Sequence, residues 1–283
     1  MPRVRTRVVT VGLLHPGAMG VTIGASCRDE VVWASSDRSP ATRARAEAAG
    51  FRDVETVAAM VACTDLIVSV CPPESATGVA HEVADLGFAG TYVDANAIAP
   101  STARAIGRRF ASFVDGGIVG PPATQVGTTR LYLSGEAVGA VAERWEGPLD
   151  VRVLDGDAGA ASALKMAYAM WTKVSAALLL DVRALAKAEG VEHALLGEWE
   201  QSQPGTSQRS EATASGVAPK AWRFAGEMDE MATAALDVGL PSGFAEAAAE
   251  IYRRLADMKD RDTVDLEDVV VRLVLGARPD ENR

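Results

Sequence analysis

A single lysine, Lys165, stands in an otherwise apolar run that begins at Gly159 and has the composition of a long helix. Lysine is seldom fully buried without a function, and an amine in an apolar pocket has its pKa lowered towards neutrality. Such an amine can accept a proton from an alcohol or return one to a carbonyl oxygen. The sequence therefore marks Lys165 as a candidate general acid or base. The alternative is a surface lysine whose aliphatic stem lies along the helix.

A glycine-containing turn near the N-terminus is the candidate site for a cofactor. The β-rich run 8–12 leads into this turn, and a helix of small residues follows. The start of such a helix offers free N–H groups to a pyrophosphate. The spacing departs from G-x-G-x-x-G at its second glycine, where Leu14 stands, so a turn without a ligand is the alternative. The residues expected to line the turn are Gly12, Leu13, Leu14, His15, Pro16, Gly17, Ala18 and Met19.

The segment after the second expected strand (30–34) bears on the choice between NAD and NADP. NAD sites usually hold the ribose with an acidic side chain at this position. Here Ser35 and Ser36 are neutral, and Arg38 can bind a phosphate through two N–H groups. We therefore expect NADP rather than NAD. Asp37 is an observation in favour of NAD, and a solvated loop charge is the alternative reading of Arg38.

Two further segments follow expected strands and should lie at the same sheet edge. Cys71, Pro72 and Pro73 come after the strand 66–70, and Asn96 comes after the strand 91–94. We expect Cys71 to be a small buried residue of the cofactor site rather than a nucleophile. Asn96 is a candidate hydrogen-bonding partner of the nicotinamide or the substrate, and a side chain that stabilises its own turn is the alternative.

The elements that must position these residues change in character near residue 156. Strands and helices alternate before it, which predicts an α/β fold with an N-terminal Rossmann doubly wound sheet in 1–156. Helical periodicity alone continues after it, which predicts an all-helical substrate and dimerisation domain in 157–283. Residues 160–189 should form one interdomain helix about 45 Å long at 1.5 Å per residue. Residues 201–219 should form a loop, and 277–283 a frayed tail.

The bulk composition limits the class of protein. The chain has 283 residues, 48% of them hydrophobic, and a net charge of −10, so a large core is expected and a nucleic-acid partner is not. Its three cysteines lack C-x-x-C spacing and its three histidines lack ligand spacing, which predicts reduced thiols, no metal site and a cytoplasmic location. No run approaches the roughly 18 apolar residues that span a membrane.

Together these stretches resemble the β-hydroxyacid dehydrogenases, the family of 3-hydroxyisobutyrate and 6-phosphogluconate dehydrogenases. The C-terminal half looks most like a bacterial branch described as phosphogluconate dehydrogenase-like. The family segments D-x-S-T-x-x-P, D-A-P-V-S-G-G and G-x-G-x-x-x-K-x-x-N are matched by 94–100, 115–121 and 159–168. The resemblance implies an NAD(P)-dependent dehydrogenase that uses Lys165 as its acid or base. It also implies that the substrate lies beside Asn96, Val119, Gly120, Pro121 and Tyr168.

The departures from the family concern the substrate's carboxylate. Val119 replaces a serine that helps to hold this carboxylate in the family, and Tyr168 replaces an asparagine. Residues 227–229 stand where the family has a second lysine. We therefore assume no carboxylate in the substrate.

Three functions remain open from the sequence. The first is an NADP-dependent oxidoreductase for a small hydroxy or carbonyl compound, acting as a homodimer whose long helices intertwine. The second is an imine reductase, which shares this architecture but usually lacks a lysine at the position of Lys165. The third is a non-catalytic dinucleotide-binding protein, which would bind the cofactor without turnover.

Overall fold

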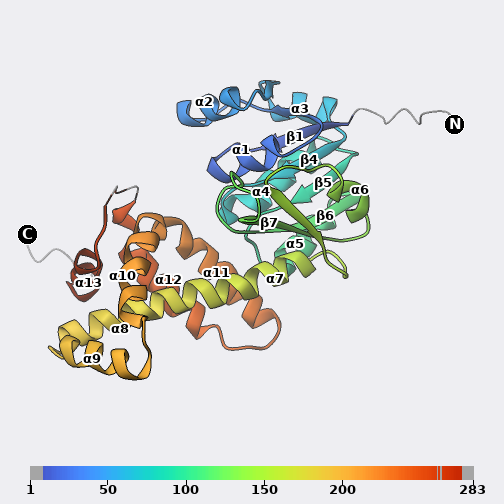
Figure 1. Cartoon of the computed structure of the whole chain (residues 1–283). Helices are drawn as coiled ribbons and strands as arrows, with labels where there is room; N and C mark the ends of the chain where they lie inside the picture. Colours follow the sequence, from blue (N-terminus) through green and yellow to red (C-terminus); the bar gives the residue numbers. More distant parts are fainter. Residues whose placement is uncertain (1–8, 260, 262, 276–283) are drawn as a thin grey trace, which may run out of the picture. The chain divides into compact units, whose positions relative to one another are not determined.

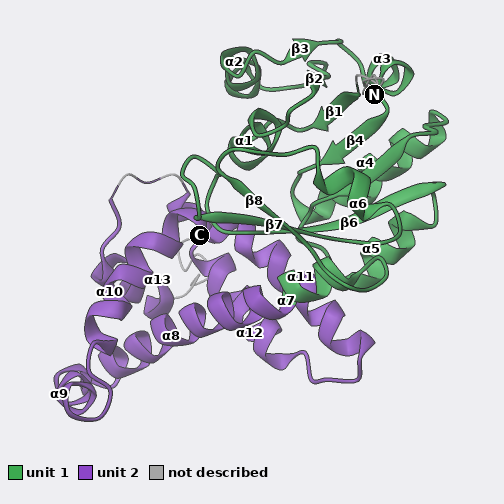
Figure 2. Ribbon diagram, turned by 45° about the vertical axis from the view of Figure 1, so that its right-hand side comes forward, with its two compact units in different colours: residues 1–166 green, residues 167–283 purple. Residues whose placement is uncertain are grey.

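The computed structural model describes residues 9–259, 261 and 263–275, and the chain divides into two compact units, 1–166 and 167–283 (Figure 2). The boundary expected at 156 precedes helix α7 (Ala160–Ala169), whereas the division falls inside this helix. The first turns of α7 pack on the sheet of the first unit, which is why they belong to it. The tail expected at 277–283 lies outside the described residues.

The first unit is built on one eight-stranded sheet (Figure 1). Its order is β3-β2-β1-β4-β5-β6-β7-β8. Neighbours from β3 to β6 are parallel, β7 is antiparallel to β6, and β8 is parallel to β7. The order from β3 to β6 is that of a Rossmann doubly wound sheet, which confirms the predicted fold class. The strands are β1 Thr10–Leu14, β2 Glu30–Trp33, β3 Arg52–Asp53, β4 Leu66–Ser69, β5 Thr91–Asp94, β6 Ser112–Val119, β7 Thr129–Ser134 and β8 Leu149–Val153.

The helices of the first unit connect these strands, and local signals set several of their ends. Ser39 caps α2, because its side chain accepts a hydrogen bond from the N–H of Thr42, and Pro40 occupies the first turn. The short helix after β7 ends at Ala142, before the buried Trp145. The helices are α1 Ala18–Ala25, α2 Pro40–Ala48, α3 Val57–Cys63, α4 Pro73–Asp85, α5 Pro100–Gly107 and α6 Val138–Ala142, followed by α7.

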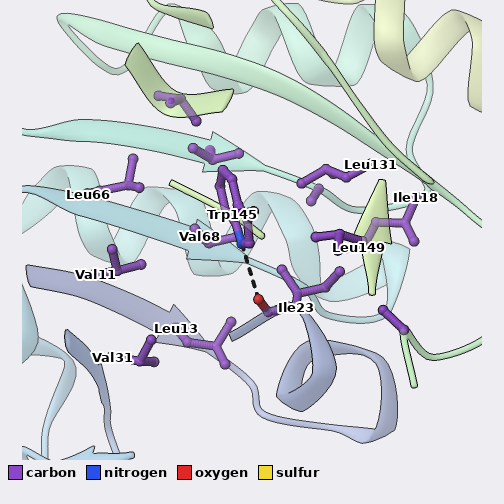
Figure 3. Packing of buried hydrophobic residues seen from close by; sticks show 14 of the residues in the cluster. Val11, Leu13, Ile23, Val31, Leu66, Val68, Ile118, Leu131, Trp145 and Leu149 are labelled. Carbon is purple, nitrogen blue, oxygen red and sulfur yellow. Dashed lines mark hydrogen bonds between the residues drawn. The ribbon is translucent and has the colours of Figure 1, made fainter. Parts of the chain in front are cut away.

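A buried tryptophan anchors α1 to the sheet. Trp145 is 5% exposed and packs in a cluster with Val11 and Leu13 of β1 (Figure 3). Its indole N–H donates to the carbonyl of Ile23 in α1 at 3.1 Å. The ring buries a large apolar area and satisfies its one polar group. This contact fixes α1 against β1 and so sets the position of the turn that joins them.

The second unit is all-helical, as predicted. Among the residues that the structure describes, no helix is both long and apolar enough to cross a membrane. Its elements are the π-helical segment η1 Met170–Val174, α8 Ser175–Ala188, α9 Glu192–Ser202, α10 Thr206–Val217, the 3-10 turn η2 Ala218–Lys220, α11 Ala221–Asp237, α12 Gly243–Arg254, the 3-10 turn η3 Ala256–Met258 and α13 Leu266–Leu275.

The long helix predicted from 160 to 189 forms, with a π-helical segment in its middle. Helix α7, η1 and α8 follow one another without a break to Ala188. A π turn changes the hydrogen-bond register of a helix, and the carbonyl of Lys173 accepts a hydrogen bond from the Tyr252 hydroxyl at 2.6 Å. The Lys173 amine pairs with Glu227 and lies 4.2 Å from the centre of the Phe224 ring. These contacts tie η1 to α11 and α12.

The loop predicted from 201 to 219 is wrong, because helix α10 occupies most of this segment. Ser210 and Ala214 of α10 are fully buried, and the buried Arg183 of α8 donates to the Ser210 hydroxyl at 2.5 Å. Gly205, with φ +87°, supplies the turn before the helix. Serine, glycine and threonine are weak helix formers, but tertiary packing outweighs these small preferences.

Candidate functional site

The carboxyl ends of β1 and β4 form the point at which the strand order reverses. The chain leaves β1 towards β2 on one side and leaves β4 towards β5 on the other. Leu14, the last residue of β1, is in register with Ser69, the last residue of β4. Ligands of open α/β sheets bind in the crevice outside the strands at such a point. The turn from β1 into α1 and the segment after β4 are therefore brought together, as predicted.

The turn itself lies three residues later than the sequence spacing indicated. Gly12 lies inside β1, where a Cβ would meet the Met60 sulfur at 2.7 Å, so it is a packing glycine. His15 takes the left-handed conformation, φ +66°, that the first glycine of the fingerprint usually supplies. A Cβ on Gly20 would lie 2.5 Å from the His15 carbonyl oxygen, so Gly20 serves the close packing assigned to the third glycine. The sequence interpretation missed Gly20.

Gly17 occupies the middle position of this shifted fingerprint, and its free side faces open space. A Cβ on Gly17 would meet nothing closer than the His15 carbonyl oxygen at 4.0 Å. Gly17 is the N-cap of α1, and no side chain among the described residues caps the helix there. Ala18, in the first turn, is exposed. The positive end of α1 and its first N–H groups are thus open to an anion.

Two polar atoms beside this turn lack hydrogen bonds. Nδ1 of His15 and Nε of Arg38 are both buried and have no partner within the described part of the chain. Burial, with a smaller contribution from Arg38, lowers the pKa of His15 to about 4, so its ring is neutral at pH 7. The Arg38 charge acts on both His15 and Cys71, which places the guanidinium close to the crevice. An unsatisfied buried donor costs about 1–3 kcal/mol, and a bound phosphate would satisfy it.

The start of α2 adds two arginines that the sequence interpretation did not single out. Nε of Arg45 donates to the carbonyl of Pro16 at 3.3 Å, which holds the half-buried Arg45 against the turn. Nε of Arg43 donates to the carbonyl of Arg38 at 3.2 Å. Arg43 therefore lies beside the loop of Arg38, and Arg45 lies beside the turn after β1. The two arginines are two residues apart and so do not share a face of α2, which is why helical spacing gave no signal for them.

The predicted serines at the end of β2 already have partners within the protein. The Ser36 hydroxyl donates to the carbonyl of Glu55 at 2.7 Å. Ser35 is 5% exposed and hydrogen-bonds to the Asp53 carboxylate. Asp37, the residue that favoured NAD, is exposed and has φ +58°. The serines thus fix the loop that carries Arg38, whose charge acts on His15 and Cys71.

Asn96 ties the ends of two strands together. It is 2% exposed, its Oδ1 accepts from the N–H of Cys71 at 2.6 Å, and its Nδ2 donates to Ser69 and to Asp94, each at 3.0 Å. Both amide hydrogens are therefore used inside the protein, which favours the structural role that the sequence left open for Asn96. Burial raises the pKa of the Cys71 thiol to about 12, so the thiol stays protonated at neutral pH.

Pro72 and Pro73 begin the helix that follows this segment. Pro72 is the N-cap of α4 and Pro73 its first residue. Proline suits this place because its missing N–H would have no partner in the helix. The two residues hold the chain at the crevice opposite the turn of β1.

The predicted substrate segment after β6 folds back towards α1. Val119 is 3% exposed and ends β6. Gly120 has φ +124°, and a Cβ there would lie 2.2 Å from the Thr128 carbonyl oxygen, so only glycine fits this bend. Pro121 is exposed at the bend, and its carbonyl accepts from the Thr129 hydroxyl at 2.5 Å. Farther along, the N–H of Ala123 donates to Thr22 of α1 at 2.9 Å. The segment therefore lies beside the helix that begins at the turn.

Lys165 is half-buried on α7, where this helix packs against β6. A Cβ on Gly117 would lie 2.7 Å from the carbonyl oxygen of Ala161 and 3.1 Å from Cβ of Lys165. Asp115 is in register with Asp94 at the end of β5. Gly117 therefore lies two residues beyond the level at which β5 ends. Cβ of Lys165 thus lies at the carboxyl edge of the sheet, the edge that also carries the turn after β1.

Tyr168 belongs to the second unit, and its ring is 47% exposed. It lies one turn after Lys165 in α7. In place of the family's second lysine, Glu227 pairs with Lys173 inside the second unit. Among the tryptophans of this unit, Trp199 is buried, whereas Trp171 and Trp222 are 71% and 40% exposed.

The residues of the crevice fit a dinucleotide better than a metal ion. An uncapped helix N-terminus, an open glycine and an arginine with an unsatisfied donor are anion-binding groups. Across the described residues, no group of three or more His, Cys, Asp and Glu side chains gathers to hold a metal.

Two comparisons of the sequence found similar proteins. Residues 186–255 match the family model of a domain of unknown function, DUF1932. An uncharacterized 28.5 kDa protein encoded in the 5′ region of a 7S RNA of Methanothermus fervidus is 27% identical over 197 residues, which are 68% of this chain and 77% of that protein.

Solved structures show the same two-domain fold. A conserved protein of unknown function, described as structurally similar to 3-hydroxyacid dehydrogenases, is 26% identical with a TM-score of 0.66, over 88% of this chain and 98% of its own. The 3-hydroxyisobutyrate dehydrogenase of Mycobacterium tuberculosis, solved with L-serine, is 17% identical with a TM-score of 0.68, over 94% of this chain and 99% of its own. The predicted resemblance in fold is thereby confirmed.

Proposed function

We propose that this chain, a β-hydroxyacid dehydrogenase-like protein, is an NADP-dependent oxidoreductase that transfers hydride between the nicotinamide and a small hydroxy or carbonyl compound. The observation that carries the proposal is the crevice at the reversal of strand order. There an uncapped helix N-terminus, the open side of Gly17 and the unsatisfied Nε of Arg38 meet. Cβ of Lys165 lies at the same sheet edge, from which its amine would reach the substrate.

Different residues around the turn would bind different parts of the dinucleotide. The N–H groups that begin α1 would bind the pyrophosphate, which can approach because Gly17 carries no side chain. Arg38 would bind the 2′-phosphate of NADP, and Arg43 and Arg45 would add positive charge around it. Bound NADP(H) would supply the hydride acceptor or donor.

Lys165 would move the proton that accompanies the hydride. In oxidation, its neutral Nζ accepts the hydroxyl proton of the substrate while the carbon loses hydride. In reduction, its ammonium form donates a proton to the oxygen of the carbonyl as the carbon gains hydride. Val119 presents an apolar side chain where the related dehydrogenases have a serine. We therefore propose a small substrate class that is not restricted to carboxylates.

The test is turnover with NADPH or NADP on a panel of small carbonyl and hydroxy compounds. Lys165→Ala should lower kcat by about 100-fold or more and leave the Kd for NADPH within about twofold. Lys187→Ala is the control, because that exposed lysine pairs with Glu267 on the surface. Survival of turnover in Lys165→Ala would favour the imine reductase alternative. Binding of NADPH without turnover on any compound would favour a non-catalytic protein.

We also propose a homodimer in the cytoplasm. The helix that runs through η1 and α8 has exposed apolar side chains every seven residues, at Trp171, Leu178 and Leu185, which are 71%, 59% and 63% exposed. Apolar side chains repeated in this way can pair two helices. The cytoplasmic location rests on the three cysteines, all free thiols. Light scattering should give a dimer mass that Leu178→Glu lowers to that of a monomer. Leu86→Glu, at an exposed leucine of the first unit, should leave the dimer intact.

A further inference from the structure

The first turn of α7 is bonded to strand side chains. The Asp115 carboxylate of β6 accepts hydrogen bonds from the N–H groups of Gly159 and Ser162, both at 2.9 Å. The Ser134 hydroxyl of β7 accepts from the N–H of Ala161 at 3.0 Å and donates to Asp115 at 3.1 Å. A helix ordinarily leaves its first N–H groups without partners. Here two neighbouring strands satisfy three of them.

Asp115 is suited to this role because it carries a charge and two acceptor oxygens. It is fully buried, and its other oxygen accepts from the Ser162 hydroxyl at 2.5 Å. The groups that donate to it are neutral, so the positive end of α7 and these hydrogen bonds compensate its charge. Both helix N–H groups bond to the same oxygen, Oδ2, so an asparagine would place a neutral acceptor there and lose the charge that strengthens these bonds. The isosteric amide therefore keeps the shape of the contacts but not their charge-assisted strength.

The bonded turn also sets where Lys165 lies. Asp115 and Gly117 are two apart in β6 and so face the same side of the sheet. Ser162 and Lys165 are three apart in α7 and share one helix face. Ser162 is bonded to Asp115, and Cβ of Lys165 lies against Gly117. The helix therefore runs along the strand in one register, and a shift of the first turn would move the amine.

We propose that Asp115 is the positioning residue for Lys165, because its carboxylate locks the first turn of α7 onto β6 and thereby fixes the amine at the carboxyl edge of the sheet. The catalytic consequence of this lock rests on the proposed function. The lock itself does not, and each is measured separately.

Hydrogen exchange of the α7 amides tests the lock without any substrate. In Asp115→Asn, the amides from Gly159 to Lys165 should exchange at least about tenfold faster than in the wild type, while amides of β4 and β5 keep their rates. Ser134→Ala should accelerate the same amides by a smaller factor, because it removes one of the capping bonds. Unchanged exchange from Gly159 to Lys165 in a folded Asp115→Asn protein overturns the proposal.

Kinetics test the consequence for catalysis. Asp115→Asn should lower kcat about tenfold or more and leave the Kd for NADPH unchanged. The loss should disappear in the Lys165→Ala background, because two residues that act through one amine are not additive. An equal further loss in that background would show a general structural effect and overturn positioning. If the wild type turns over no compound, the proposed function fails, while the exchange result still decides whether the lock exists.

Discussion

Two helices begin at the same edge of the sheet, and their first turns are built in opposite ways. Helix α1 has Gly17 as its N-cap, and within the described residues no side chain caps it and two buried polar atoms nearby lack partners. Helix α7 begins at Ala160, and the N–H groups of Gly159, Ala161 and Ser162 are bonded to Asp115 and Ser134. Both helices offer the same partial positive charge. The partial positive charge of α1 is open to a ligand, whereas that of α7 interacts with the buried carboxylate of Asp115.

The comparison shows how one physical device serves two purposes in this fold. An open N-terminus has affinity for an anion from solution. An N-terminus whose N–H groups are bonded to a strand has no such affinity for an anion, and these bonds hold the helix in place on that strand. A dinucleotide needs the first property, and a residue that transfers a proton needs the second. The following predictions concern substitutions in the open turn of α1 and in the residues beside it.

The largest effect is expected from glycine substitutions that separate packing from ligand binding in the α1 turn. Gly20→Ala should lower the free energy of unfolding by about 2–3 kcal/mol, because its Cβ would lie 2.5 Å from the His15 carbonyl oxygen. Gly17→Val should lose only about 1 kcal/mol of stability, because valine is a poorer N-cap than glycine. It should bind NADPH about 100-fold more weakly, since its side chain would fill the space for the pyrophosphate. Denaturant unfolding and calorimetric titration measure these two effects. Undiminished NADPH binding by Gly17→Val would remove the turn from the cofactor site.

A smaller, selective effect is expected at the 2′-phosphate. Arg38→Ala should weaken NADPH binding about tenfold or more, as loss of a charge-assisted hydrogen bond would, and should leave NADH binding unchanged. Arg108→Ala, at an exposed position after α5, is the matched control and should alter neither. Titration of each variant with both cofactors gives the ratio directly. An equal loss for NADH and NADPH would contradict the assignment.

The smallest effect concerns the pH dependence of His15. Its pKa is about 4 in the folded protein and 6.5 in the unfolded chain, so the unfolded state binds more protons between these values. The free energy of unfolding should therefore fall by roughly 1 kcal/mol on account of this group between pH 7.5 and pH 5.5. His15→Asn, which tolerates positive φ, should show a correspondingly smaller fall. His193→Asn, at an exposed position, should keep the wild-type fall; an identical fall in His15→Asn would show that His15 is not buried as described.

The sheet and the helix caps were predictable because their signals are local. Buried β-rich runs identified β1, β4 and β5, and a serine before a proline marked the start of α2. The position of the cofactor turn was not predictable from the sequence, because a histidine, rather than a glycine, takes the left-handed conformation in this turn. Helix α10 formed against its composition because Arg183 and the neighbouring helices bury its small residues.

Contacts between distant residues account for the rest of the candidate site. Asp115 reaches an N–H group 44 positions later in the chain, and no spacing rule connects the two. Arg45 reaches the turn only because α2 packs beside α1. Lys165 was identified from its apolar surroundings in the sequence, but its contact with Gly117 of β6 is not contained in the pattern of the helix.

The most direct test of the account is thermal unfolding of the wild type and of Gly17→Val, each with NADPH and with NADH at equal concentration. A ligand at about 100 times its Kd adds roughly 2.7 kcal/mol to the stability of the protein that binds it. The account predicts a clear rise in the Tm of the wild type with NADPH, little or none with NADH, and none in Gly17→Val. A rise with NADH alone would reverse the choice of cofactor. No rise with either cofactor, or the same rise in Gly17→Val, would contradict the proposal that the open turn of α1 binds a dinucleotide.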